Sequence, residues 1–538
     1  MSADRRRTVA SGAVAFVSGA VLLGMELAAS RVLAPYFGNS LFVWGALIGV
    51  VLAGLSIGYW LGGALADRMP QPWLVVVVLV LGGLAVLAVP LLDDPVLRLI
   101  VRWDPGPRLD PLLAAILLFG LPSVVLAGVT PIVVRLLASS VTTVGRTAGR
   151  LFSVSTAGSI AGTFATAFWL IPDVGLDQVF SLMALALFAA AALFALVEGM
   201  KLASAPALAA FAVAVLAVVM LAPETGGKLD AARAGNYSPL YRLERDRGLA
   251  QDATLGPDSR VVFQKETRYH HLAVVDALGS RYLRFDSSMQ SAMKLGEPYA
   301  TEFAYTDFFD LGIAYHPSTK HALFIGLGGG SAPKRMWRDF PGIDIQVAEL
   351  DGVVADVARR YFALPKSPRL RVTVDDGRQF LVKNDERWDL IGIDTFYSDS
   401  IPFHMTTREF LELARDHLAP GGVIVTNVIG SLEGPSSKLF RSMYKTYRSA
   451  FPTVVVHPVD GLGRSPQNVG NLILVAGDGS APEEAFLLRR WNEIRRSHPH
   501  APDLTRAILD RRLRPVDTDD VPLLTDDYAP TDALLYAG

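Results

Sequence analysis

The chain has 538 residues, of which 51% are hydrophobic and only 19% are charged. Soluble domains carry roughly 25% charged residues, so an ordinary soluble composition is excluded. The 50 basic and 52 acidic residues nearly cancel, and this balance gives no electrostatic support for nucleic-acid binding. The absence of Cys excludes disulfides, thiolate metal sites and Cys nucleophiles, and we assign no metal ligands.

The N-terminal part of the sequence is a series of apolar runs, each near the ~20 residues that a helix needs to cross a bilayer. Residues 1–222 therefore predict a helical membrane domain of about seven spans. Gly at spacing four in two of these spans predicts close packing between helices. The expected spans are 10–34, 42–66, 73–93, 111–138, 151–171, 177–197 and 203–222.

Three ionisable residues, Glu26, Arg31 and Arg135, lie in or near the apolar runs. Such groups are costly in a membrane and usually face a bundle interior or a cavity. A polar transport path and simple extension of the side chains to the interface both remain open.

Basic residues give a conflicting indication of orientation. Residues 5–7 are all Arg and place the N-terminus in the cytoplasm. Seven spans would then leave the rest of the chain outside. However, Arg98, Arg102 and Arg108 fall in a loop that this topology places outside, so the charge pattern and the span count disagree.

The remainder of the sequence reads as water-soluble. Residues 223–260 are polar and predict a linker, and residues 261–317 predict a small antiparallel β module. Residues 318–538 predict an α/β domain, because short apolar strands alternate with helical segments.

The α/β domain begins with a strand at 322–325, a glycine-rich turn at 326–330 and a helix near Pro333. A second strand ends at Glu349, about twenty residues past the glycines, which is the spacing typical of nucleoside binding. The glycines let the backbone approach the ligand, and the carboxylate accepts hydrogen bonds from the ribose hydroxyls.

Two further strands, 370–374 and 388–393, also end at acidic residues. Ligands of open α/β sheets bind at the carboxyl ends of the strands. Four strand ends are therefore expected to meet at one crevice. They contribute Gly326, Gly328, Glu349, Asp376 and Asp394.

At this point the sequence resembles the spermidine synthase (polyamine aminopropyltransferase) family over roughly residues 260–475. The matching segments are 285–290 (Phe-Asp-Ser-Ser-Met-Gln), 302–305 (Glu-Phe-Ala-Tyr), 325–330 (Ile-Gly-Leu-Gly-Gly-Gly), 349–354 (Glu-Leu-Asp-Gly-Val-Val), 375–377 (Asp-Asp-Gly) and 407–410 (Thr-Arg-Glu-Phe). Residues 31–38, 58–68 and 524–530 (Leu-Thr-Asp-Asp-Tyr-Ala-Pro) resemble the subgroup in which this domain is fused to membrane helices.

The resemblance implies a polytopic helical membrane domain plus an α/β domain. The α/β domain would have a doubly wound, methyltransferase-like (Rossmann-like) sheet after the antiparallel module. It further implies aminopropyl transfer from decarboxylated S-adenosylmethionine to a diamine such as putrescine, with no permanently bound cofactor. Asp394 would take the proton of the attacking amine. The donor would be held by Gly326, Gly328, Glu349 (ribose), Asp376 and Gly377 (adenine) and His270; the acceptor would be held by Gln290, Glu302, Tyr305, Tyr397 and Asp399.

The sequence departs from the family at several of these positions. Gly329 stands where the family has an acid near the amino end of the donor, and Tyr397, near Asp399, stands where it has a second acid. Thr306 replaces a His, and His270 replaces a donor-binding Gln. Because buried cations require paired charges, the loss of acids leaves two alternatives open. One is a methyltransferase that uses S-adenosylmethionine itself on another acceptor. The other is a transporter or sensor with a nucleoside-binding domain, using Glu26, Arg31 and Arg135.

The expected location is the plasma membrane, with the transferase domain in the cytosol, because adenosyl sulfonium donors are made inside cells. The expected partners are the lipid bilayer and a small diamine or other amine acceptor. Nucleic acid is not an expected partner, and the sequence leaves a homodimer open.

Overall fold

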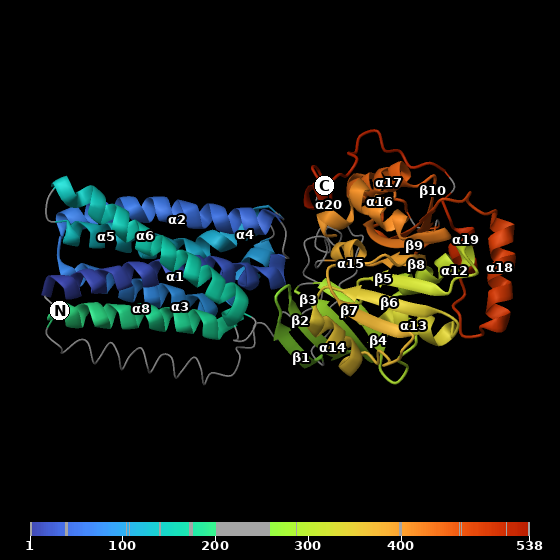
Figure 1. Ribbon diagram of the computed structural model, residues 1–538, viewed down its shortest axis with the longest axis horizontal. Coiled ribbons are helices and arrows are strands. Elements are labelled where there is room, and N and C mark those ends of the chain that lie inside the picture. The colour runs from blue at the N-terminus through green and yellow to red at the C-terminus, as the bar shows by residue number, and fades with distance from the viewer. Residues whose placement is uncertain are drawn as a thin grey trace. The chain divides into compact units, whose positions relative to one another are not determined.

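The structure is a computed structural model that describes residues 3–37, 41–103, 105–106, 108–138, 141–171, 176–200, 259–286, 288–396, 401–461, 463, 465–512 and 514–535. The chain divides into two compact units, one formed mainly by the N-terminal helices and the other by the C-terminal α/β fold (Figure 1).

Within the described residues, six helices are long and apolar enough to cross a membrane. They coincide with the first six spans expected from sequence. The seventh expected span, 203–222, and nearly all of the expected linker lie outside the described residues. The helices are α1 (Ala3–Phe37), α2 (Leu41–Arg68), α3 (Pro72–Trp103), α4 and α5 (Leu109–Ala115 and Leu121–Leu137, joined by the π-helical turn Ile116–Gly120), α6 (Val141–Ala165, continued by the π-helical turn Thr166–Leu170) and α8 (Leu176–Val197).

Glycines allow close approach between two pairs of these helices. On α6, a Cβ added to Gly158 would lie 2.0 Å from the carbonyl oxygen of Phe16 on α1. On α2, a Cβ added to Gly58 would lie 2.3 Å from the carbonyl oxygen of Val124 on α5. The backbones of α1 and α6, and of α2 and α5, are therefore in direct contact, as the glycine spacing predicted.

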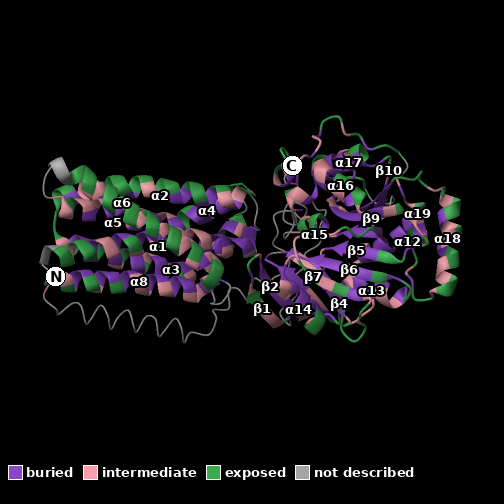
Figure 2. Ribbon diagram, in the orientation of Figure 1, coloured by how far each residue is buried: buried purple, intermediate pink, exposed green. Residues whose placement is uncertain are grey.

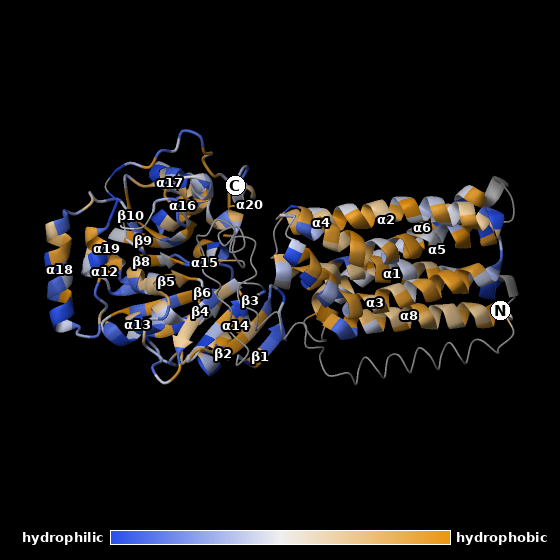
Figure 3. Cartoon of the chain, turned by 180° about the vertical axis from the view of Figure 1, so that it is seen from behind, coloured by the Kyte–Doolittle hydropathy of each residue, from blue (hydrophilic) through white to orange (hydrophobic). Residues whose placement is uncertain are grey.

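The outer surface of the helical unit is apolar. Trp60, Trp103 and Trp169 are each more than 60% exposed. Figure 2 shows the exposed residues on the outer sides of these helices, and Figure 3 shows that the same helices are predominantly hydrophobic. Such a surface is unfavourable in water and suits contact with lipid.

The small β module is a four-stranded antiparallel sheet in the order β1-β2-β3-β4. Its strands are β1 (Arg260–Glu266), β2 (His271–Ala277), β3 (Ser280–Phe285) and β4 (Ser288–Lys294), of which β4 was not predicted as a strand. Leu278 and Gly279 connect β2 to β3 with φ angles of 52° and 79°. Two left-handed residues at the turn match the twist of an antiparallel hairpin.

The C-terminal unit is built on a seven-stranded sheet in the order β10-β11-β9-β8-β5-β6-β7. The strands β9, β8, β5, β6 and β7 are parallel, and β11 is antiparallel to both of its neighbours. The strands are β5 (His321–Ile325), β6 (Asp344–Glu349), β7 (Leu370–Val374), β8 (Trp388–Ile393), β9 (Leu418–Gly430), β10 (Thr453–Pro458) and β11 (Gly470–Gly477).

Neighbouring strand residues such as Phe324 and Ile325 are both buried, so the sheet is covered on both faces. This is the doubly wound, methyltransferase-like architecture expected from the sequence. The helices are α12 (Leu311–Tyr315), α13 (Ser331–Asp339), α14 (Gly352–Tyr361), α15 (Gly377–Lys383), α16 (Arg408–Asp416), α17 (Lys438–Ala450), α18 (Glu484–Ser497), α19 (Thr505–Leu509) and α20 (Thr531–Leu535), with 3₁₀ turns at Ala304–Asp310, Phe403–Met405 and Pro435–Ser437.

Candidate active site

The carboxyl ends of β5, β6 and β8 converge at the point where the strand order reverses. The sheet ladder continues one residue past β5 and one residue past β8. The amide of Gly326 donates to the carbonyl of Ala348 (2.9 Å), and the amide of Asp394 donates to that of Ile325 (2.9 Å). The predicted residues Gly326, Glu349 and Asp394 are thus brought to one edge of the sheet, which is the usual ligand-binding edge of such folds.

The glycine-rich turn after β5 requires glycine for steric reasons. Gly326 has a φ of +94°, and a Cβ at this position would lie 2.1 Å from the carbonyl oxygen of Asp394. Gly328 also has a positive φ of 53°. The amide of Gly329 donates to the hydroxyl of Ser291 on β4 (2.8 Å), so the small β module supports the turn.

Glu349, at the end of β6, accepts hydrogen bonds from backbone amides of the glycine-rich turn and of its own strand end. One carboxylate oxygen accepts from the amide of Leu327 (3.0 Å), and the other accepts from the amide of Asp351 (2.8 Å). Burial raises the pKa of Glu349 to about 7. The amide of Gly328 also donates to this carboxylate. With about four lone-pair sites, the carboxylate retains the capacity to accept one further hydrogen bond, from a ligand hydroxyl.

Asp376 follows β7 and caps the N-terminus of α15. One oxygen accepts from the amide of Gln379 (2.9 Å), and the other accepts from Nε2 of His404 (3.1 Å). The hydrogen bond from His404 lowers the pKa of Asp376. Gly377 is tightly packed, because a Cβ there would lie 2.1 Å from the side chain of Ile325.

Asp394, at the end of β8, is held by two side chains. Nδ2 of Asn427 on β9 donates to its carboxylate (3.0 Å), and the Tyr305 hydroxyl also donates to it. Asn471 donates to Oδ1 of Asn427 (2.9 Å), which fixes the orientation of the Asn427 amide. Burial raises the pKa of Asp394 to about 6. The result is a buried carboxylate with aligned partners, which titrates within reach of neutral pH.

The predicted acceptor residues are only partly placed together. Tyr305 reaches Asp394, and Gln290 lies on β4 beside Ser291, close to the glycine turn. Glu302 lies near β3, where burial and then its charge raise the pKa of Tyr282. Two further acceptor candidates fall outside the described residues. They are Tyr397 and Asp399.

His270 and Arg135 were also singled out in the sequence, and each has identified partners in the structure. His270 lies between β1 and β2, and its amide donates to the hydroxyl of Thr267 (3.0 Å). Arg135 pairs with Asp67 (3.1 Å), and both side chains are largely exposed near helix ends. This pairing explains Arg135 without a path through the bundle.

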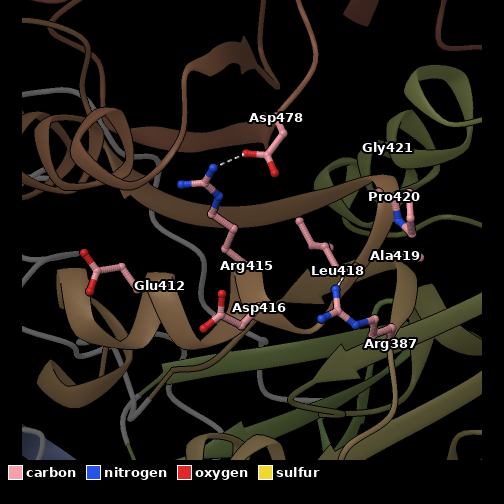
Figure 4. Close-up of a pocket in the computed structure, with 10 residues that line it drawn as sticks. Arg387, Glu412, Arg415, Asp416, Leu418, Ala419, Pro420, Gly421 and Asp478 are labelled. Carbon is pink, nitrogen blue, oxygen red and sulfur yellow. Dashed lines mark hydrogen bonds and ion pairs between the residues drawn. The ribbon is translucent and has the colours of Figure 1, made fainter.

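A surface pocket of about 380 Å³ lies at the opposite edge of the sheet, where β8 and β9 begin (Figure 4). Arg387, Arg415 and Asp478 line it, and Arg415 and Asp478 form an ion pair (2.9 Å). This pocket lies beside the amino ends of β8 and β9. It is therefore separate from the candidate site, which lies at the carboxyl ends of the strands.

Sequence reasoning missed three side chains of the site: Ser291, His404 and Asn427. Asn427 was detectable, because it is a polar residue within the otherwise apolar run of β9. Ser291 and His404 gave no comparable signal, since each reaches the site only through tertiary packing.

A sheet of this order, with a glycine turn after its first strand and an acid at the end of the second, defines a methyltransferase-like fold. Comparison with known proteins shows what this part of the chain is similar to. Residues 302–459 match the family described as "Spermine/spermidine synthase domain". This match lies within the C-terminal unit and follows the six long apolar helices in the sequence.

Several individual proteins are similar to this chain at low identity. The chain is 26% identical over 285 residues to a polyamine aminopropyltransferase of Vibrio vulnificus, covering 51% of this chain and 92% of that protein. It is 29% identical over 174 residues to putrescine N-methyltransferase 2 of Nicotiana attenuata, covering 31% of this chain and 45% of that protein. A crystal structure of a probable spermidine synthase from Corynebacterium glutamicum aligns at 22% identity with a TM-score of 0.37, over 50% of this chain and 100% of that one.

Proposed function

We propose that this chain is a membrane-anchored polyamine aminopropyltransferase. It would transfer the aminopropyl group of decarboxylated S-adenosylmethionine to a diamine such as putrescine and leave methylthioadenosine. The observation that carries the proposal is the buried Asp394 carboxylate, held by Tyr305 and Asn427 next to the glycine turn.

In the proposed reaction, the amine nitrogen attacks the methylene carbon bonded to the sulfonium sulfur. The C–N bond forms as the C–S bond breaks, and sulfur keeps the electron pair. The attacking nitrogen releases one proton, which passes to Asp394. An alkylamine has a pKa of about 10 and is mostly protonated at neutral pH, so a carboxylate that orients it and accepts its proton supports the attack.

The other predicted residues have the following proposed roles. Gly326 and Gly328 allow the backbone to approach the donor, Glu349 binds the ribose, and Asp376 with Gly377 binds the adenine. His270 is proposed at the donor as well. The proposed acceptor residues are Gln290, Glu302, Tyr305, Tyr397 and Asp399.

Product analysis with both donors tests the proposal. The full-length protein in lipid nanodiscs would receive putrescine with decarboxylated S-adenosylmethionine, or with S-adenosylmethionine, and the products would be identified by mass spectrometry. Aminopropylated putrescine is the expected product. Asp394→Asn should lower turnover by about 10²–10⁴ while donor affinity is retained, because a positioned base contributes about that much.

A matched control lies on the same strand. Asp389, at the opposite end of β8, accepts from the amides of Lys320 and His321. Asp389→Asn makes the same chemical change at the other edge of the sheet and should leave turnover within about threefold of the wild type, the size of a remote structural effect. Equal turnover of wild type and Asp394→Asn would remove Asp394 from the chemistry.

Methyl transfer from S-adenosylmethionine is a second candidate, favoured by the surroundings of Gly329. A Cβ there would lie 2.9 Å from the Phe362 ring and 3.0 Å from Cβ of Ser291, so this turn has no space for the acid that the resemblance led us to expect. Without that acid, a donor that carries its own carboxylate meets less repulsion. Methylated putrescine in the same assay, with no aminopropylated product, would favour this candidate and reject the first.

A further inference from the structure

The C-terminal segment, residues 524–530, packs on the elements that carry Asp376. The amide of Arg408 donates to the carbonyl of Leu524 (2.9 Å), and the amide of Asp526 donates to Glu409 (3.0 Å). Thr525 and Tyr528 close a tight turn by exchanging two backbone hydrogen bonds of 3.0 Å. This segment is thus an ordered part of the C-terminal unit, attached to the start of α16.

The carboxylate of Asp526 makes a bidentate ion pair with Arg378 on α15. Nη1 donates to Oδ1 (2.7 Å), and Nη2 donates to Oδ2 (2.6 Å). The hydroxyl of Thr407, which caps α16, also donates to Oδ1 (2.7 Å). Two parallel charge-assisted bonds fix direction as well as distance, so this pair sets the position of the Arg378 guanidinium.

Arg378 passes this constraint to the candidate donor site. Its Nη1 also donates to the carbonyl oxygen of His404 (3.1 Å). The His404 ring in turn donates to Asp376 (3.1 Å), and Asp376 caps the helix on which Arg378 lies. Asp526, Arg378, His404 and Asp376 therefore form one continuous chain of hydrogen bonds, leading from the C-terminal segment to the site.

We propose that Asp526 is a positioning residue for donor binding. Through Arg378 and the main chain of His404, it holds Asp376 and the start of α15 where they bind the adenine of the donor. This inference rests on the proposed function, in which Asp376 and Gly377 contact the adenine. The segment 524–530, singled out in the sequence but given no role there, thereby becomes part of the donor-binding machinery.

A second ion pair, formed by a residue just before this segment, provides a control. Asp520 pairs with Arg441 on α17, with Nη2 to Oδ2 at 2.9 Å and a second bond from Nη1 to Oδ1. It is also bidentate and also ties the C-terminal residues to a helix. However, α17 packs against α16, α20, β9 and β10 and carries none of the proposed donor-site residues. Asp520→Asn should therefore cause a similar loss of stability without changing Asp376 and Gly377, which are proposed to bind the adenine.

The test compares Asp526→Asn, Arg378→Gln, the double variant and Asp520→Asn with wild type, all as full-length protein in nanodiscs. Binding of methylthioadenosine and of S-adenosylhomocysteine would be measured by calorimetry, together with the KM for donor and acceptor and the unfolding midpoint. Asp526→Asn should weaken both adenosyl ligands by about 3- to 30-fold, the range for residues that act through others. The donor KM should rise by the same factor, and the acceptor KM should not change.

Two further results would support the inference. The double variant should bind adenosyl ligands no more weakly than the poorer single variant, because both residues act through one pair. Asp520→Asn should lower the unfolding midpoint about as much as Asp526→Asn does, with unchanged affinity for the ligands.

Different outcomes overturn different proposals. If the wild type binds the ligands and Asp526→Asn binds them equally well, or if Asp520→Asn weakens them equally, the positioning role is wrong and the proposed function stands. If the wild type binds neither adenosyl ligand, the proposed function is wrong, and the positioning role is overturned with it.

Discussion

Two buried carboxylates dominate the candidate site at the scale of single residues. Burial raises the pKa of Glu349 to about 7 and the pKa of Asp394 to about 6. Hydrogen bonds to the charged forms, such as that from Asn427 to Asp394, act in the opposite direction. Both acids therefore change charge within the range of pH in which an enzyme can be assayed, and each gives a pH-dependent prediction.

Turnover should increase with pH as Asp394 ionises, with a midpoint near its pKa of about 6, because only the carboxylate accepts a proton. Asn427→Ala removes a hydrogen bond that stabilises the charged form, so the midpoint should move to higher pH. The measurement is kcat from pH 5 to 8 for both proteins. Because the amine acceptor ionises in the same way in both assays, the difference between the two pH profiles reports the ionisation of Asp394. Identical profiles for wild type and Asn427→Ala would contradict this role for Asp394.

Glu349→Ala should weaken the binding of adenosyl ligands by about 1–3 kcal/mol, the cost of removing a charged hydrogen-bond partner. Since the ionised form is the better acceptor, wild-type affinity should rise through pH 7, and the affinity of the variant should not. Calorimetry at pH 5.5 and 8.5 checks both effects. Glu386→Ala, an exposed acid that bonds Gln346 before β8, is the control and should bind normally. Unchanged affinity of Glu349→Ala would exclude Glu349 from the site.

At the scale of elements, the membrane helices depend on close contact between backbones. In lipid, the hydrophobic effect does not hold helices together, so packing at small residues must do so. The structure places Gly158 of α6 and Gly58 of α2 directly against a neighbouring backbone, whereas Gly149 of α6 has no atom within 4 Å of an added Cβ.

Gly158→Leu should therefore destabilise the helical unit by about 1–3 kcal/mol or more, because overpacking at a backbone contact separates α1 from α6. Gly149→Leu, the same change on the same helix, should have little effect. Thermal unfolding of both variants in the same detergent, followed by helix content, is the measurement. Equal midpoints for the two variants would mean that the contact between α1 and α6 does not stabilise the bundle.

At the scale of the whole molecule, the number of membrane crossings decides the side of the transferase domain. Six helices of the described residues can cross, and an even number returns the chain to the side of its N-terminus. The positive-inside rule predicts a cytoplasmic N-terminus from Arg5, Arg6 and Arg7. The expected span 203–222 lies outside the described residues and would reverse the result if it also crossed.

We predict that the C-terminal unit faces the cytosol, where adenosyl donors are made. A reporter that is active only outside the cytoplasm, fused after Gly538, should show no activity. The same reporter fused after Arg68, between the second and third spans, marks the N-terminal side, and a fusion after Phe37 marks the other side. Activity of the C-terminal fusion equal to that after Phe37 would reject the cytosolic placement.

Much of the architecture was determined by the sequence alone. Apolar runs of bilayer length predicted the six described membrane helices, because length and hydropathy decide membrane insertion locally. The rhythm of strand, glycine turn, helix and acid placed Gly326, Glu349, Asp376 and Asp394 at strand ends, because a parallel sheet brings successive carboxyl ends to one edge. These features depend on periodicity and spacing, which can be read from the chain.

Only the tertiary structure decided the rest. The strand β4 lacks clear alternation, yet it pairs with β3 and presents Ser291 to the glycine turn. Helix α3 continues through Pro90 and Pro95 to Trp103, past the predicted end of its span, because proline is tolerated where neighbouring helices support the backbone. The contacts of Asn427 with Asp394 and of Asp526 with Arg378 join residues 33 and 148 positions apart. Such contacts depend on how the helices and strands pack against one another, and no local pattern in the sequence specifies them.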